Sequence, residues 1–436
     1  MNSDFSYIYP KSKHKHGDSD FFMAKTGDGD TVLVVSGSDA ELFYGEDKLI
    51  SGVKHRICLL TVENSKVLRK LFDFLNPVSH KGHDKTIGLG DRLGLASGGH
   101  IKAVCNAGFF PVLAQQSMRE LNLTGRSYDD VLASAAMAVF REGYTGGYGA
   151  DGDHLKSRDE VKYAIDCGFS MITLDCSEHI SPDSSSLQQP EQVYRPAIEH
   201  IVSIYNEFIK GTSLDFEISL DETQASTSPQ THLFVTKELK NRGVDFISLA
   251  PRFPGEFQKG IDYRGDLSEF ERDFTAHVQI AKEFGYKLSV HSGSDKFSVF
   301  PSIGKLTGGR FHIKTAGTSW LEAVRVIAML EPSLYRKIHA FALSHLSEAK
   351  KYYHITEDIS KIPDIHNMSD VELPDYMNKD DSRQVLHITY GLLLSAKASD
   401  GTLLFRDRLY ETLRANEDAY DAALVKHIKR HLMELF

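Results

Sequence analysis

The chain repeats one pattern of polar and apolar positions from about residue 85 onward. A stretch with apolar residues at helical spacing ends at a glycine, and a short apolar run follows at once. Glycine ends a helix in the left-handed conformation without steric cost, and a strand starting directly after it is typical of the αβ loop of a parallel α/β protein. The glycines with this pattern are Gly143, Gly168, Gly211, Gly243 and Gly285.

Three further apolar runs, "KTIGLGD", "FFPVLAQ" and "RFHIKTAG", bring the number of predicted strands to eight. They lie near residues 86, 110, 148, 171, 215, 245, 287 and 310. Eight strands that alternate with helices favour a closed barrel over an open sheet. The prediction is an α/β protein with a TIM (β/α)8 barrel over residues 85–330. Residues 1–84 form an N-terminal β-rich elaboration, and residues 331–436 form a C-terminal helical extension.

Alternation within the predicted strands separates two faces. In "FEISLDE" the apolar residues Phe216, Ile218 and Leu220 share one parity, so the polar residues between them share the other. In a barrel one parity faces the helices and the other faces the axis. Charged groups on the axis are costly unless a ligand or metal pairs with them. The residues with inward parity are Thr173, Asp175, Glu217, Ser219, Asp221, Ser248, Ala250, Arg252, Ser289, His291, His312 and Lys314.

Composition narrows the class of protein. The chain has 436 residues, 41% of them hydrophobic, with a formal net charge of −10 and a pI of about 6.1. This balance argues against nucleic acid or an anionic membrane as a partner, because binding by counterion release needs a basic face. No stretch approaches the roughly 20 apolar residues of a membrane span. Four cysteines without a C-x-x-C pair indicate a reduced, cytoplasmic protein. The basic segment at residues 11–16 is expected to be a flexible terminus.

Residues 148–157, "YGADGDHLKS", raise the question of a metal site. They follow the third predicted strand, at the face where barrel enzymes keep their chemistry. A calcium loop fails on spacing, because Leu155 and Lys162 stand where oxygen ligands are needed. A solvated turn with Ser157 as helix N-cap is the alternative. His154, His291 and His312 come from three strands on one face, and imidazoles with carboxylates around an open position suit a catalytic divalent cation.

A single inward histidine is more often a structural residue than a metal ligand. The metal-site hypothesis therefore depends on the convergence of the three histidines. His345, beyond the last strand, is a reserve ligand. An anionic substrate is indicated by "KTAGTSW" (314–320), where a strand meets a helix N-terminus, and by Lys314, Lys296 and Arg252. The alternative is that these cations pair with carboxylates such as Asp175. "GLGDRLGLASGG" (88–99) lacks the G-x-G-x-x-G spacing of a dinucleotide site.

Four motifs in order, "GYGADGDHLK", "LAPRFPGEFQKGIDY", "SVHSGSDKFS" and "HIKTAGTSWLEA", make the chain resemble the tagaturonate epimerase family. The resemblance is clear from about residue 85 to 345. It implies a barrel that uses a divalent cation (manganese, nickel, zinc or cobalt) to interconvert D-tagaturonate and D-fructuronate, with relatives that accept neutral ketoses. It also implies Asp153 as proton acceptor, Glu256 as proton donor, and His154, His291 and His312 as metal ligands. The expected substrate-binding residues are Arg252, Lys296, Lys314, Asp175 and Gln115.

The inverted carbon of such a substrate is β to the ketone, so its C–H bond is not acidified by the carbonyl. We therefore expect retro-aldol cleavage and recombination rather than proton abstraction at that carbon. A metal-dependent aldolase or ketose isomerase on the same barrel is the alternative among enzymes, since fold does not fix reaction. A non-catalytic sugar-acid sensor is the alternative from another class. The partner in each case is a small sugar acid, and the chain is a possible homo-oligomer.

Overall fold

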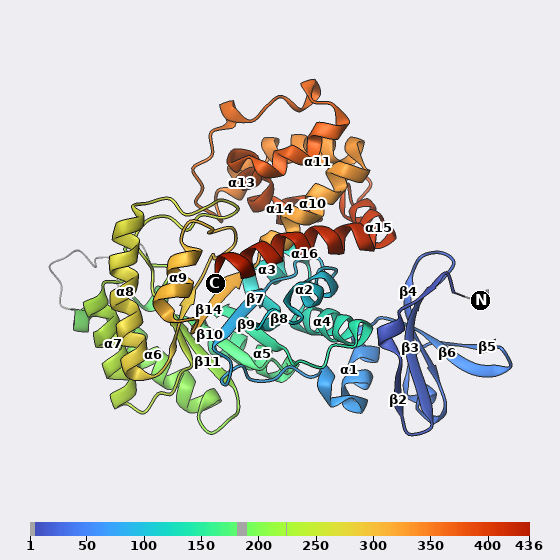
Figure 1. Ribbon diagram of the computed structural model, residues 1–436, viewed down its shortest axis with the longest axis horizontal. Helices are drawn as coiled ribbons and strands as arrows, with labels where there is room; N and C mark the ends of the chain where they lie inside the picture. The colour runs from blue at the N-terminus through green and yellow to red at the C-terminus, as the bar shows by residue number, and fades with distance from the viewer. Residues whose placement is uncertain (1–4, 181–189, 224) are drawn as a thin grey trace.

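The computed structural model describes residues 5–180, 190–223 and 225–436 (Figure 1). The stretch 181–190, "SPDSSSLQQP", is expected from its sequence to be a loop, and all of it except Pro190 lies outside the described residues. Figure 1 shows an antiparallel sheet at the N-terminal end, the barrel beside it, and a group of helices above the barrel. The predicted fold class, a TIM barrel with a β-rich elaboration before it and helices after it, is confirmed.

Eight parallel strands close into the barrel, in the spatial order β10-β11-β12-β13-β14-β7-β8-β9. Every strand predicted from the sequence is present. Their outward residues, such as Ile218, Leu288 and Ile313, are fully or almost fully buried against the surrounding helices. The strands are β7 (Lys85–Leu89), β8 (Phe110–Ser117), β9 (Gly149–Leu155), β10 (Met171–Asp175), β11 (Asp215–Ser219), β12 (Ser248–Ala250), β13 (Lys287–Val290) and β14 (Phe311–Thr315).

Helices follow the strands and pack on the outside of the barrel. Gly143, Gly168 and Gly285 end their helices in the left-handed conformation, as predicted, and Ser157 caps the next helix with a capping box. The helices are α2 (Ser97–Val104), α3 (Met118–Thr124), α4 (Tyr128–Glu142), α5 (Arg158–Cys167), α6 (Pro190–Ile204) with the π-helical turn η5 (Tyr205–Ile209), α7 (Pro229–Asn241), α8 (Leu267–Phe284), α9 (Phe300–Thr307) and α10 (Thr318–Leu330).

The N-terminal segment forms a six-stranded antiparallel sheet joined to the barrel by α1 (Val62–Leu71). Its strands are β1 (Tyr7–Ile8), β2 (His14–His16), β3 (Ser19–Lys25), β4 (Thr31–Ser36), β5 (Glu46–Ile50) and β6 (Val53–Leu59), with short helices η1 (Pro10–Ser12), η2 (Ser38–Leu42) and η3 (Asp73–Leu75). The expectation of a flexible terminus at residues 11–16 is wrong. β2 pairs with β3, and the His14 ring packs against Phe72, Phe74 and Phe140.

The C-terminal helices form a second hydrophobic core together with α10 and its Trp320. They are α11 (Pro332–Ser344), α12 (Leu346–Ala349), η6 (Ile359–Lys361), η7 (Ile365–Asn367), η8 (Asp370–Asn378), α13 (Asp380–Ile388), α14 (Tyr390–Ser395), α15 (Arg406–Ala415) and α16 (Glu417–Glu434). The last helix returns to the barrel, where it contacts α2 and α10. Among the described residues, no helix is both long and apolar enough to cross a bilayer.

The chain directly after α16 packs against α9 at Gly304, where a larger residue would clash with the backbone. A Cβ on Gly304 would lie 2.2 Å from the carbonyl oxygen of Leu435. We expect Gly304→Ala to lower the free energy of unfolding by about 1–3 kcal/mol, because the end of the C-terminal helix must move. A thermal melt measures the change. Gly82→Ala is the matched control, since a Cβ there meets no atom within 4 Å. Equal melting temperatures for the two variants would contradict this account.

Candidate active site

The β9 strand carries a bulge that places two adjacent side chains in the same site. Asp151 and Gly152 pair with Met171 and Ile172, but the next pairing joins Leu155 to Leu174, so β9 has one extra residue there. His154 takes up the irregularity with a left-handed φ of 52°, a conformation that non-glycine residues adopt mainly where the surroundings impose it. Neighbours in a regular strand point to opposite faces, whereas a bulge re-aims one of them. Asp153 and His154 therefore both line the central pocket.

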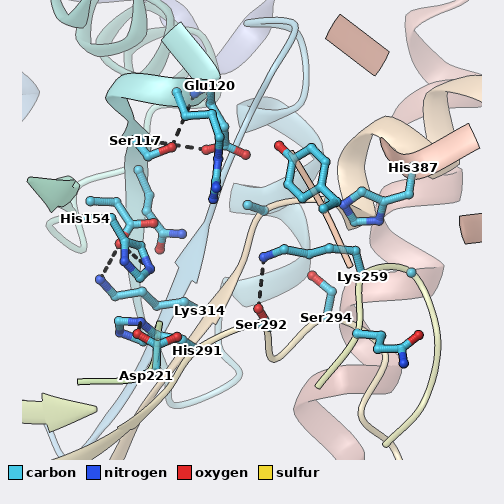
Figure 2. A pocket seen from close by; sticks show the side chains of 18 of the residues that line it. Ser117, Glu120, His154, Asp221, Lys259, His291, Ser292, Ser294, Lys314 and His387 are labelled. Carbon is cyan, nitrogen blue, oxygen red and sulfur yellow. Dashed lines mark hydrogen bonds and ion pairs between the residues drawn. The ribbon is translucent and has the colours of Figure 1, made fainter. Parts of the chain in front are cut away.

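His154, Asp221 and His291 converge from three strand ends. Their ligand atoms lie within 4.8 Å of one another, and the two imidazole rings are 4.8 Å apart between centroids. Nδ1 of His291 lies 3.0 Å from Oδ1 of Asp221, close to the spacing of adjacent ligands in an octahedral shell of about 2.1 Å radius. Two imidazoles and one carboxylate are a donor set that divalent transition metals accept. These residues fit a divalent cation (Figure 2).

Two further carboxylates lie near the ring nitrogens of His291 and His154 that face away from the cluster. Nε2 of His291 lies 2.7 Å from Oε1 of Glu217, which is fully buried, and Nδ1 of His154 lies 3.7 Å from Oδ2 of Asp175. Metal-binding histidines are commonly held by a carboxylate on the nitrogen that faces away from the ion, which fixes the orientation of the ring. Glu217 occupies such a position for His291, whereas Asp175 lies beyond hydrogen-bond distance of His154 and contributes its charge alone. Asp175, expected to bind substrate, lies behind His154 and receives a hydrogen bond from the Ser177 amide.

Lys314 lines the pocket and lies at the centre of a buried ionic network. Its Nζ is 2.7 Å from Asp151 Oδ2, 2.8 Å from Asp153 Oδ1 and 2.9 Å from Glu217 Oε1, and it donates to Thr173 Oγ1 at 2.6 Å. Burial opposes the charged form, but the three carboxylates raise the pKa of Lys314 well above its usual value. Lys314 therefore remains protonated and is paired, with partners that sequence reasoning did not name.

The charges around the pocket determine the protonation states of Asp153 and His154. Burial opposes ionisation of Asp153, but Lys314, His154 and His291 outweigh it and lower the pKa of this carboxyl to about 2. Burial also favours the neutral ring of His154, yet Asp153, Asp221 and Asp175 raise its pKa to about 10. In the absence of a cation, Asp153 is ionised and His154 is an imidazolium at neutral pH.

The structure does not bring His312 to this cluster. His312 pairs in register with Ser289 and Thr86, so it lies one inward layer deeper than Lys314, and its Nδ1 lies 2.8 Å from Thr86 Oγ1. Burial, with Lys314 and Lys287, lowers its pKa to about 3. Within the described chain, Asp221 takes the third position of the cluster. The reserve ligand His345 is also elsewhere, stacked on Phe341 with ring centroids 3.8 Å apart.

The other expected residues are divided between the pocket and its rim. Gln115 lines the pocket with its buried Oε1 unpaired among the described residues. Lys296 also lines it, but its Nζ donates to three backbone carbonyls, at 2.8, 2.6 and 2.8 Å. Arg252 donates to the carbonyl of Thr223 and, with the half-buried Glu256, lines an adjoining cavity of about 240 Å³. That cavity shares Asp221 and His291 with the pocket, so Glu256 is near the cluster without contacting it.

The pocket also has residues that sequence reasoning missed. Arg92, Arg119, Lys259 and His387 line it. Lys259 belongs to a motif that resembles the family, while Arg92 lies in the glycine-rich stretch 88–99, which lacks the spacing of a dinucleotide site. His387 comes from α13 in the C-terminal extension. Strand parity, which predicted the inward residues of the strands, does not apply to loops or to a distant helix.

Comparisons with known proteins cover nearly the whole chain. A family model described as tagaturonate epimerase matches residues 9–193 and 182–435. The tagaturonate/fructuronate epimerase of Thermotoga maritima is 41% identical over 98% of this chain and 96% of its own length. Two crystal structures of the fructuronate-tagaturonate epimerase of Cohnella laeviribosi, one native and one complexed with one glycerol, are 46% identical. Each has a TM-score of 0.95 and matches over 98% of this chain and 96% of its own.

The matches confirm the family resemblance carried by the four sequence motifs. They extend it to the N-terminal sheet and the C-terminal helices, which the motifs did not include. The chain belongs to the tagaturonate epimerase family and is an enzyme of the isomerase class.

Proposed function

We propose that this enzyme interconverts D-tagaturonate and D-fructuronate with the help of a divalent cation held by His154, Asp221 and His291. The observation that carries the proposal is the placement of this cluster beside an ionised carboxylate, Asp153, in one pocket. The names of the relatives support the substrate pair. We assign Asp221 as the third ligand in place of the expected His312, because Asp221 lies at the same level of the barrel as His291 and His154, whereas His312 lies one layer deeper.

The bound cation supplies a Lewis acid that stabilises negative charge developing on the ketone and the neighbouring hydroxyl oxygen. The protein supplies the rest. Glu217 holds the ring of His291 in place with a contact of 2.7 Å, and Asp175 places a negative charge 3.7 Å from Nδ1 of His154. Lys314 holds Asp153 at 2.8 Å and keeps it ionised, which a proton acceptor must be before the reaction begins.

Asp153 takes the proton from the hydroxyl group on the carbon β to the ketone. The bond between that carbon and the α-carbon breaks, its electron pair passes to the α-carbon and the ketone, and an enediolate and a three-carbon aldehyde acid result. Rotation of the aldehyde presents its other face, and the α-carbon attacks it to reform the bond. The new alkoxide then takes a proton from Glu256, the half-buried acid of the adjoining cavity. Loss of the proton of Asp153 to solvent and uptake of a proton by Glu256 restore both groups for the next turnover.

The proposal is tested by nuclear magnetic resonance of the purified enzyme with Mn²⁺ or Zn²⁺ added and removed, and with D-tagaturonate in D₂O. We expect fructuronate to appear with hydrogen retained at the inverted carbon, because cleavage never breaks that C–H bond. Incorporation of deuterium at that carbon would contradict the cleavage mechanism and favour proton abstraction. Absence of fructuronate with every divalent cation would overturn the epimerase assignment.

Cation binding is expected to release protons. His154 has a pKa of about 10, and the pKa of His291 is raised because Asp221 and Glu217 outweigh burial. His154 is therefore protonated at pH 7, and the raised pKa of His291 favours the charged form of that ring as well; each ring must be neutral to bind a cation. We expect at least one proton per cation, from His154, and an affinity that falls as the pH falls. Calorimetry in buffers of different ionisation enthalpy measures the number of protons released per bound cation. His345→Ala should leave it unchanged, and release of no protons would contradict this assignment.

A further inference from the structure

A second group of cations lies at the opposite end of the same pocket. Arg92, Arg119 and Lys259 line the pocket together with the cation cluster. Figure 2 shows Lys259 and His387 across the pocket from His154 and His291. The mechanism uses none of these residues, so this end of the pocket, here called the cationic end, needs its own explanation.

Arg92 is fixed with part of its guanidinium free. Its Nε and Nη2 lie 2.9 and 2.8 Å from Glu120 Oε1, and its Cζ lies over the Tyr390 ring, 3.9 Å from the centroid. The side chain is 2% exposed, yet Nη1 has no hydrogen-bond partner anywhere in the described chain. A buried donor left unsatisfied costs stability unless a ligand pairs with it.

Arg119 and Lys259 are also incompletely neutralised. Nη2 of Arg119 lies 3.3 Å from Glu222, while its buried Nε is unpartnered among residues 5–180, 190–223 and 225–436. Lys259 donates to the hydroxyl of Ser292 at 2.9 Å, a neutral partner. Burial, with the charges of Arg119 and Arg92, lowers the pKa of Lys259. The three cations thus repel one another across a shared space.

His387 adds a neutral ring to the cationic end, because burial and the charges of Arg92 and Lys259 lower its pKa well below the usual value. The residue is 1% exposed, and neither ring nitrogen has a partner among the residues described. Gly317 makes room for it, because a Cβ there would lie 1.8 Å from His387 Cε1. Gly317 is the N-cap of α10, a 13-residue helix, and the free amides of a helix N-terminus attract anions. A built, unsatisfied anion-binding arrangement therefore faces the pocket.

We propose that the cationic end binds the carboxylate of the sugar acid, with Arg92, Arg119 and Lys259 as its partners. The inference rests on the proposed function, since it assigns the far end of the same substrate. The three cations face two carboxylates, Glu120 and Glu222, so one positive charge remains for the ligand. A carboxylate matches that excess, whereas the phosphoryl group of a sugar phosphate carries nearly two negative charges at pH 7.

The test compares D-tagaturonate with D-tagatose, which differ only in having a carboxylate or a hydroxymethyl group at the terminal carbon. Calorimetry gives Kd for each sugar with the Mn²⁺-loaded enzyme and with Lys259→Gln and Arg119→Gln. Each substitution should weaken tagaturonate binding by about 10- to 100-fold, as for a lost hydrogen bond to a charged group. Binding of tagatose should change less than about 3-fold. Lys305→Gln, on an exposed lysine of α9, is the control.

The outcomes separate this inference from the proposed function. Equal weakening of both sugars, or of neither, overturns the carboxylate assignment even if the enzyme is an active epimerase. Selective loss of tagaturonate binding supports it even if no epimerisation occurs. D-tagatose 6-phosphate tests the other anion, and tighter binding of this sugar phosphate than of tagaturonate overturns the choice of carboxylate.

Discussion

Replacing His291 by alanine is expected to lower kcat/KM for tagaturonate by about 1,000-fold or more. His291 contacts both Asp221, at 3.0 Å, and Glu217, at 2.7 Å, so its loss removes a proposed ligand and one of the partners of the buried Glu217, which retains Lys314 and Ser248. Stabilisation of transition-state charge by a cation contributes several kcal/mol, and each 1.4 kcal/mol is a factor of about ten in rate. Steady-state rates, with the bound cation measured by atomic absorption, check the expectation.

Two histidine variants serve as comparisons. His345→Ala removes an imidazole that stacks on Phe341, away from the pocket, and should retain activity and bound cation. His312→Ala should retain the cation but reduce stability, because His312 is buried among Thr86, His80 and Lys287. Loss of the cation from His312→Ala, together with its retention in Asp221→Asn, would restore His312 as the third ligand. Full activity of His291→Ala, or of enzyme stripped by chelator, would remove the cation from the mechanism.

The barrel and its polar interior could be predicted because both depend on local patterns. Alternation has a period of two residues whatever surrounds the strand, so it correctly placed Glu217, His291 and Lys314 toward the axis. Parity gives the face of a strand but not the depth along it. His312 has the correct parity and the wrong layer, about 6.6 Å below Lys314 at 3.3 Å per residue. Only the register of β13 on β14 determines that depth.

Other parts of the site depend on irregular or distant structure. Strict alternation would turn either Asp153 or His154 away from the pocket, and the bulge in β9 that brings both inside leaves no local signal in "ADGDHL". Arg252 follows the end of β12, where parity no longer applies, and it pairs with a backbone carbonyl instead of facing the axis. His387 reaches the pocket only because α13 packs on the barrel, a tertiary contact that no pattern within the helix encodes.

The substitution Asp153→Asn is expected to lower kcat by about 100- to 10,000-fold, the range of a lost general base. The amide is nearly isosteric and its oxygen can still accept from Lys314 Nζ, so the pocket should keep its shape and its cation. The measurement is kcat together with the cation stoichiometry. Asp159→Asn, at an exposed aspartate in the first turn of α5, is the matched control and should retain wild-type rates.

Asp151→Asn decides between the two carboxylates that share Lys314. Burial and the charges of Asp153 and Glu217 outweigh Lys314 and raise the pKa of Asp151 to about 6, whereas that of Asp153 is about 2. Pairs held apart in this way often divide the acid and base roles of an active site. Asp153 lines the pocket and Asp151 lies below it, so only Asp153 can reach a substrate hydroxyl. A loss of turnover in Asp151→Asn alone, with wild-type turnover in Asp153→Asn, would transfer the role of base to Asp151.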